Sequence, residues 1–109
     1  MMSDKRVVLT TAGSVDEANK IADALVQRRL AACVNVVGPI SSVYRWKEKV
    51  EHAQEWLLLI KTTAGMVDAA SDALKELHSY ELPECVALAV ESGSEAYLEW
   101  IGENVAIPE

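Results

Sequence analysis

The stretch Glu55-Trp-Leu-Leu-Leu-Ile-Lys61 decides the fold of this chain. It closes a long extended segment that begins at Val50 and ends at Thr62. Successive side chains of a strand point to opposite faces of a sheet. Trp56, Leu58 and Ile60 therefore lie on one face and Leu57 and Leu59 on the other, so both faces of this strand are apolar.

A second strand, predicted over residues 84–91, repeats the pattern in Cys85-Val-Ala-Leu-Ala-Val90. Helices can cover only one face of a sheet of this size, and the other face would expose an apolar patch of several hundred Å² on a monomer. We expect another copy of the chain to cover it. The alternative is that the C-terminal helix folds over this face with Tyr97, Leu98 and Trp100.

The remaining segments complete a β-α-β-β-α-β order. A capping box, Ser14 with Glu17, predicts the start of the first helix, which should end near Leu30, and Gly38-Pro39 predicts a bulge in the second strand. The predicted strands are 6–11, 33–46, 50–62 and 84–91, and the predicted helices are 14–30, 66–78 and a short one capped by Ser94. This is the α+β, ferredoxin-like two-layer sandwich, with a long hairpin and a short C-terminal helix.

The predicted hairpin is longer than the helices that should cover it. Its second strand, at roughly 3.3 Å per residue, spans about 43 Å, whereas a first helix of about seventeen residues spans about 25 Å. The arm should overhang the helices, where it would either fray or pair with a neighbouring chain.

Length and composition predict one domain over residues 1–109, with an ordered core at about 6–105, because 109 residues that are 50% hydrophobic fill one core of ordinary size. The net charge of −7 disfavours nucleic acid and anionic membranes as partners. The N-terminal residues have no apolar run of a signal peptide, and Cys33 and Cys85 stand far apart as expected for reduced thiols. We therefore expect a cytoplasmic protein.

Sequence motifs for catalysis are missing. The loop 10–14 has neither a Cys-x-x-Cys pair nor a phosphate-binding arginine, and no glycine cluster or Gly-x-Ser-x-Gly elbow occurs. His78, at the end of the second helix and followed by Glu81 and Glu84, is the best candidate metal ligand, since imidazole with carboxylates suits Cu(II) or Zn(II). The alternative is a helix-terminal histidine that interacts with the macrodipole.

Several motifs together resemble the CutA family of divalent-cation tolerance proteins. They are Leu30-Ala-Ala-Cys-Val-Asn35, Tyr44-x-Trp46, Glu51, Ile60-Lys-Thr62, His78-x-Tyr80-Glu81-x-Pro83-Glu84 and Tyr97-Leu-x-Trp-Ile101. The resemblance implies a ferredoxin-like homotrimer with the sheets inside. It also implies an association with copper and other divalent metals, and a likeness in architecture to the PII signalling proteins.

The chain departs from the family pattern at four positions. Glu48 stands for a glycine in the hairpin turn, where it should hold a positive φ poorly, and Ser79 stands for a proline beside His78. Thr10 and Leu77 stand where copper-binding members have a cysteine and a second histidine. Of that ligand set only His78 is present, which argues against tight copper binding.

Two functions are therefore expected. The first is a non-enzymatic cytoplasmic trimer in divalent-metal tolerance, with no obligatory cofactor and weak binding of Cu(II) or another divalent cation through His78, Glu81 and Glu84. The second is a PII-like signalling or scaffold trimer that binds a small molecule or partner protein in intersubunit clefts near Tyr44, Trp46, Lys61 and Tyr80.

Overall fold

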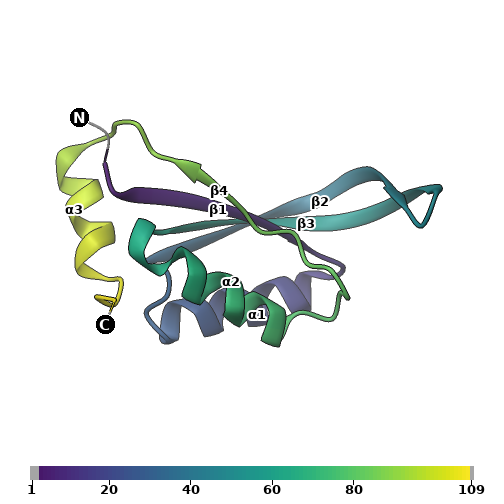
Figure 1. The fold of residues 1–109 in the computed structure, drawn as a ribbon, viewed down its shortest axis with the longest axis horizontal. Coiled ribbons are helices and arrows are strands. Elements are labelled where there is room, and N and C mark those ends of the chain that lie inside the picture. Colours follow the sequence, from purple (N-terminus) through teal and green to yellow (C-terminus); the bar gives the residue numbers. More distant parts are fainter. Residues whose placement is uncertain (1–2, 109) are drawn as a thin grey trace.

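The computed structural model describes residues 3–108, which form a four-stranded antiparallel sheet and three α-helices (Figure 1). The elements follow in the predicted β-α-β-β-α-β order, with the C-terminal helix last. Their bounds are β1 (Lys5–Ala12), α1 (Val15–Gln27), β2 (Cys33–Trp46), β3 (Lys49–Thr63), a 3₁₀ turn η1 (Ala64–Met66), α2 (Val67–Leu77), β4 (Val86–Ala89) and α3 (Glu95–Glu103).

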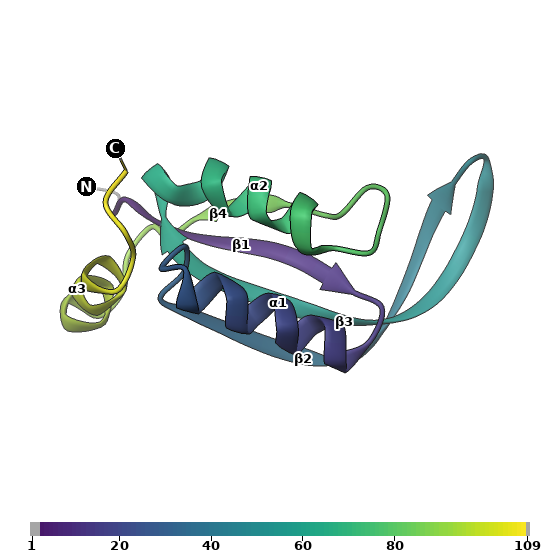
Figure 2. The ribbon, with the colours of Figure 1, turned by 90° about the horizontal axis from the view of Figure 1, so that it is seen from below.

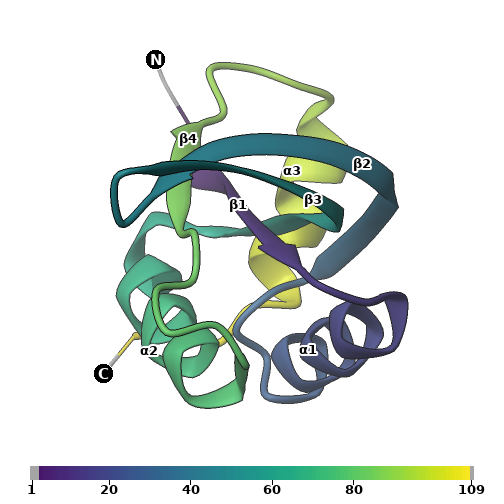
Figure 3. The same cartoon turned by 90° about the vertical axis from the view of Figure 1, so that its right-hand side faces the viewer.

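The strand order in the sheet is β2-β3-β1-β4, so β1 lies between β3 and β4. Helices α1 and α2 lie side by side on one face of this sheet (Figure 3). Val8 pairs with Ile60, and both side chains are fully buried on the helix face. The helices bury their apolar stripes against these strands, and Ile21, Leu25 and Leu74 are almost completely buried.

The opposite face of the sheet, which we call the open face, has no helix over most of its area (Figure 1). Cross-strand partners share a face, so the register identifies its apolar members as Val7, Leu9, Val37, Leu57, Leu59, Val86 and Leu88. Val86 and Leu88 are each 48% exposed. The two-faced apolar strands predicted from the sequence are therefore present, and the protomer leaves one face largely uncovered.

Helix α3 packs at one end of the sheet (Figure 1). Its Ile101, together with Val105, forms a small second core with Ala32 and Met66. Tyr97 and Trp100 stack on each other at 5.5 Å and stay about two-fifths exposed. The alternative that this helix folds over the open face is thus not what the protomer shows.

The β2–β3 hairpin extends beyond both covering helices, as predicted from its length (Figure 2). A register shift between Val37 and Ile40 confirms the bulge at Gly38-Pro39. A Cβ atom on Gly38 would lie 2.5 Å from the Trp56 ring, so the indole packs directly on the backbone at this position. Past the bulge, Val43 and Val50 are more than half exposed.

Three sequence expectations need correction. Helix α1 ends at Gln27 and not near Leu30, because Arg29 adopts a left-handed φ of 59°. Strand β4 has four residues, since the chain before Val86 turns away as an irregular loop. Lys47 and Glu48 both adopt positive φ, 49° and 70°, so the two-residue turn forms despite the missing glycine.

Candidate functional site

A pocket of about 870 Å³ opens between the hairpin arm, the end of β1 and the loop before β4. We call it the hairpin pocket. Its walls come from three strands and the 79–86 segment. The lining residues are Thr11, Ser42, Val43, Tyr44, Trp46, Glu55, Ser79, Tyr80, Glu81, Leu82, Pro83, Glu84, Cys85 and Val86.

His78 fixes the start of the loop that forms one wall of this pocket. Its side chain is completely buried, and Nε2 lies 2.5 Å from the carbonyl oxygen of Thr11. The Tyr80 backbone N–H donates to Nδ1 at 3.1 Å. A carbonyl oxygen only accepts and an amide N–H only donates, so the ring carries its proton on Nε2. Both ring nitrogens are therefore occupied within the protomer.

Tyr80 connects this loop to the hairpin. Its hydroxyl donates to Glu55 Oε2 at 2.7 Å, and its ring lies 4.5 Å from the His78 ring. Burial of the phenol, and after it the hydrogen bond to Glu55, raises the pKa of Tyr80 above its ordinary value. A Cβ on Gly13 would lie 3.2 Å from the hydroxyl oxygen, so the glycine leaves room for this contact.

Glu17 of α1 also lies close to the His78 ring. The Ser14 hydroxyl accepts from the Glu17 N–H at 3.1 Å, which confirms one half of the predicted capping box. The Glu17 carboxylate does not return to Ser14; its Oε2 accepts the Ser79 N–H at 3.3 Å. Its Oε1 is buried, lies 3.7 Å from His78 Nδ1 and accepts no hydrogen bond within residues 3–108. A proline at 79 would have no N–H to donate to Glu17.

The pocket brings together three of the four predicted cleft residues, Tyr44, Trp46 and Tyr80. Lys61 lies elsewhere in the protomer. It stands six residues, or about 20 Å, beyond Glu55 along β3, where its Nζ lies 5.4 Å from the Tyr97 ring centre and 3.3 Å from the Tyr97 hydroxyl.

The predicted metal ligands are near one another in sequence but do not converge. Glu81 and Glu84 are exposed at the pocket wall, whereas His78 is buried behind it and does not line the pocket. Within the part of the chain that the structure describes, no three His, Cys, Asp or Glu side chains are grouped to hold a metal ion. Residues 3–108 of one protomer therefore do not bring His78, Glu81 and Glu84 together as a three-ligand metal site.

Two residues of the site were not predicted from the sequence. Glu55 is only 7% exposed and was not among the candidate site residues. It lies on the same side of β3 as Leu57 and Leu59, the open face, and its burial comes with the contact to Tyr80, which sequence spacing does not reveal. No sequence signal distinguishes the role of Glu17 at Ser79 from an ordinary capping box.

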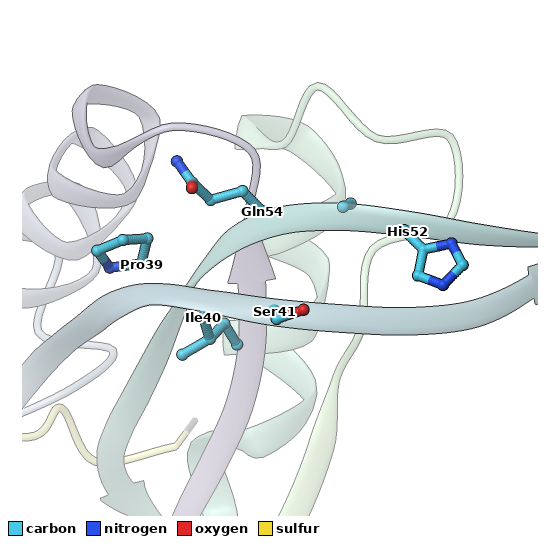
Figure 4. Close-up of a pocket in the computed structure, with 6 residues that line it drawn as sticks. Pro39, Ile40, Ser41, His52 and Gln54 are labelled. Carbon is cyan, nitrogen blue, oxygen red and sulfur yellow. The ribbon is translucent and has the colours of Figure 1, made fainter.

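A second, shallower hollow of about 360 Å³ lies on the hairpin just past the bulge. Its labelled side chains leave the strands in different directions, and the His52 ring lies apart from Pro39 and Ile40 (Figure 4). These groups do not converge on a ligand, so the hairpin pocket is the better candidate site.

Fold and site together define a small α+β protein with an unpartnered sheet face and an acidic, aromatic pocket. The family described as "CutA1 divalent ion tolerance protein" matches residues 6–104. This chain belongs to that family.

The relatives agree with the assignment over nearly the whole chain. The divalent-cation tolerance protein CutA of Thermus thermophilus is 47% identical over 100 residues, which cover 92% of this chain and 97% of that protein. A solved structure of the Thermus protein has a TM-score of 0.92 and 46% identity, covering 94% of this chain and 99% of the other. The family is described as a tolerance protein and not by a reaction.

The relatives are named for different compartments. An Arabidopsis thaliana relative, 41% identical over 87% of this chain and 52% of its own length, is called chloroplastic. A solved Archaeoglobus fulgidus structure, at 37% identity and TM-score 0.90 over 94% of this chain and 99% of that chain, is called periplasmic. Within residues 3–108 no helix is long and apolar enough to cross a membrane.

Proposed function

We propose that this chain is the ferredoxin-like protomer of a cytoplasmic homotrimer that acts, without catalysis, in tolerance of divalent metal ions such as copper. The family match over residues 6–104 is the observation that supports the role in tolerance. The open face supports the assembly. Half-exposed Val86 and Leu88 lie beside Val7 and Leu9 of β1 and form the kind of apolar surface that a second copy buries.

Metal binding in this proposal is weak and uses the exposed carboxylates of Glu81 and Glu84. His78 can join them only if Tyr80 withdraws its N–H from Nδ1, because a metal needs that lone pair. To bind the ion, the His78 ring would lose this hydrogen bond and become more exposed. Both changes cost free energy and lower the affinity for the ion. Neighbouring subunits would have to supply any further ligands.

Calorimetric titration of Cu(II) and Zn(II) tests this arrangement. We expect weak binding by the wild type and a clear loss in the double variant Glu81→Gln, Glu84→Gln, with Glu95→Gln, Glu99→Gln on α3 as the charge-matched control. His78→Ala distinguishes the two kinds of ligand. Equal binding by wild type, the loop double variant and His78→Ala would remove all three residues from the mechanism.

The second candidate function is a PII-like signalling or scaffold trimer that binds a small molecule at the hairpin pocket. The observation favouring it is the convergence of Tyr44, Trp46 and Tyr80 on one cavity. Thermal-shift measurements with metabolites and with metal ions separate the two functions, because a ligand that binds only the folded protein raises the melting temperature. Stabilisation by metals alone would favour the first function.

A further inference from the structure

Glu17, in the first turn of α1, has a buried carboxylate oxygen, Oε1, that accepts no hydrogen bond from residues 3–108. The other oxygen, Oε2, accepts the Ser79 N–H at 3.3 Å, which holds the carboxylate in place beside the ring of His78. A buried carboxylate oxygen without a donor costs free energy. In a native protein such an atom has a partner, which is a water molecule, a donor group or a cation.

The distance between Glu17 Oε1 and His78 Nδ1 narrows this choice. The two atoms lie 3.7 Å apart. A hydrogen bond between them would need about 2.7 to 3.2 Å, so the separation is too long for one. Two ligand atoms that are each about 2.1 Å from one zinc-type ion lie about 3.4 to 3.6 Å apart in a tetrahedral or trigonal arrangement. The pair is therefore spaced as two ligands of one ion.

The ring of His78 also has the tautomer that a metal ion requires. Nε2 carries the proton and donates to the Thr11 carbonyl oxygen, which leaves the lone pair on Nδ1. Metal-bound imidazoles commonly donate their other N–H to a backbone carbonyl, because that bond fixes the ring. The Tyr80 N–H occupies Nδ1 at 3.1 Å in the ion-free protein. These bonds account for the burial of His78, but they leave Glu17 Oε1 without a partner.

The pair lies on the helix side of the molecule. Glu17 belongs to α1 and His78 follows α2, and both helices cover the face of the sheet opposite the open face (Figure 3). Subunits that bury the open face therefore do not need to supply either ligand. The His78 side chain is completely buried, whereas the Glu17 side chain is 22% exposed and connects the two atoms to solvent.

We propose that Glu17 is a metal ligand, and that a divalent ion of the zinc or copper(II) type binds between Glu17 Oε1 and His78 Nδ1. One nitrogen and one carboxylate oxygen suit these ions better than magnesium or calcium. Within residues 3–108 no third His, Cys, Asp or Glu joins the pair, so water completes the coordination and binding is weak. The inference rests on the metal role in the proposed function and adds a ligand from α1 to it.

Binding at Nδ1 has a consequence for the loop before β4. The ion takes the lone pair that accepts the Tyr80 N–H, so this hydrogen bond breaks when the ion binds. The Tyr80 hydroxyl donates to Glu55 on β3, so the change at His78 reaches the hairpin through one side chain. The Tyr80 amide is therefore a direct reporter of the ion.

The test is titration of Zn(II) into the isotope-labelled wild type, followed by NMR of the imidazole nitrogens and the backbone amides. We expect a saturable shift of His78 Nδ1, with Nε2 keeping its proton, and a simultaneous shift of the Tyr80 amide. Mg(II) at the same concentration should change neither resonance, because it prefers oxygen ligands. The chain has one other histidine, His52, which is exposed on the hairpin. A zinc response confined to His52, or no saturable response, would overturn the proposal and leave water as the partner of Oε1.

Two variants in the first turn of α1 separate a ligand from a nearby charge. Glu17→Gln keeps an oxygen that can accept the Ser79 N–H, so it removes the charge with little change of shape. Asp16→Asn removes the same charge at an exposed neighbouring position. We expect the affinity for Zn(II) to fall at least about tenfold in Glu17→Gln and to stay close to wild type in Asp16→Asn. An equal loss in both would show diffuse attraction to a chain of net charge −7 and would overturn the proposal.

The loop double variant Glu81→Gln, Glu84→Gln separates this inference from metal binding by the loop carboxylates. If the double variant loses Zn(II) binding and Glu17→Gln keeps it, the binding described in the proposed function stands and Glu17 is not a ligand. If Glu17→Gln loses binding and the double variant keeps it, the ion lies between Glu17 and His78, and the loop carboxylates are not its ligands.

Discussion

Three side chains, His78, Tyr80 and Glu55, join the loop before β4 to two strands. His78 donates from Nε2 to Thr11 on β1, accepts the Tyr80 N–H, and so holds that residue where its hydroxyl reaches Glu55 on β3. Each bond positions the donor of the next. The arrangement explains a buried histidine without invoking a metal: the ring shapes the pocket wall from behind.

Tyr80→Phe isolates the last bond in this series. The ring is kept, but Glu55 loses the hydrogen bond from the Tyr80 hydroxyl, so the free energy of unfolding at pH 7 should fall by about 1 to 2 kcal/mol. Because the folded protein raises the pKa of Tyr80, the unfolded chain releases this proton first, near its ordinary pKa of about 10. Wild-type stability should therefore decrease as pH rises above that value.

Urea unfolding at a series of pH values checks both parts. The difference in the free energy of unfolding between wild type and Tyr80→Phe should become smaller above about pH 10. Tyr97→Phe changes an exposed tyrosine and keeps Tyr80, so its free energy of unfolding should fall with pH as that of the wild type does. If the difference in unfolding free energy between wild type and Tyr80→Phe did not change with pH, the role assigned to the Tyr80 hydroxyl would be contradicted.

At the scale of elements, the bulge determines how the hairpin leaves the sheet. The chain at Gly38 passes directly under the Trp56 ring, and the register changes there before the arm extends past the helices (Figure 2). A close approach of indole and backbone leaves no space for a side chain.

Gly38→Ala should therefore destabilise the protein by about 1 to 3 kcal/mol, since the added methyl group overlaps the indole. Gly102→Ala is the control. Gly102 lies inside α3, where a Cβ would meet only the flexible Lys5 side chain at 3.4 Å, and alanine favours a helix by about 0.5 to 1 kcal/mol over glycine. Denaturant midpoints that fall equally for both variants would argue against the packing role of Gly38.

The elements were predictable from the sequence where local pattern and burial agree. The two-faced apolar pattern around Leu58 located β3, and Ser14 and Ser94 marked helix starts that the structure confirms through bonds from Glu17 and Tyr97. Positive φ at Glu48 was not predictable, because the twist of the flanking strands imposes that turn on residues with little preference for it.

The site was predictable only in part. Tyr44 and Trp46 near the hairpin turn were predicted to share a cleft between subunits with Tyr80, and in the protomer these three residues line one pocket. The burial of Glu55 and the engagement of both nitrogens of His78 depend on segments that meet through the sheet register, which sequence spacing alone does not reveal. Lys61 lies away from this pocket within one protomer, and its place at a cleft between subunits stays a prediction.

At the scale of the whole molecule, the open face and the overhanging arm both favour association with further copies of the chain. The chain extends 43 Å along its longest axis and only 22 to 25 Å across, with apolar strands on one side left without a covering layer. This much exposed apolar surface is common on an isolated subunit of an oligomer and uncommon on a protein that stays monomeric in solution.

Leu88→Glu tests the assembly, because it places a charge on the apolar surface that the neighbours should bury. Leu88 is half-exposed and pairs with Val7 on the open face, so the change should cost the protomer little and the interface several kcal/mol. The wild type should sediment at about 36 kDa, three chains of 11.9 kDa, and the variant close to the mass of one chain. Ile107→Glu, at a site 89% exposed in the C-terminal segment, should leave the trimer intact. A folded wild type that sediments as a single chain at micromolar concentration would show that the exposed sheet face serves some other purpose than self-association.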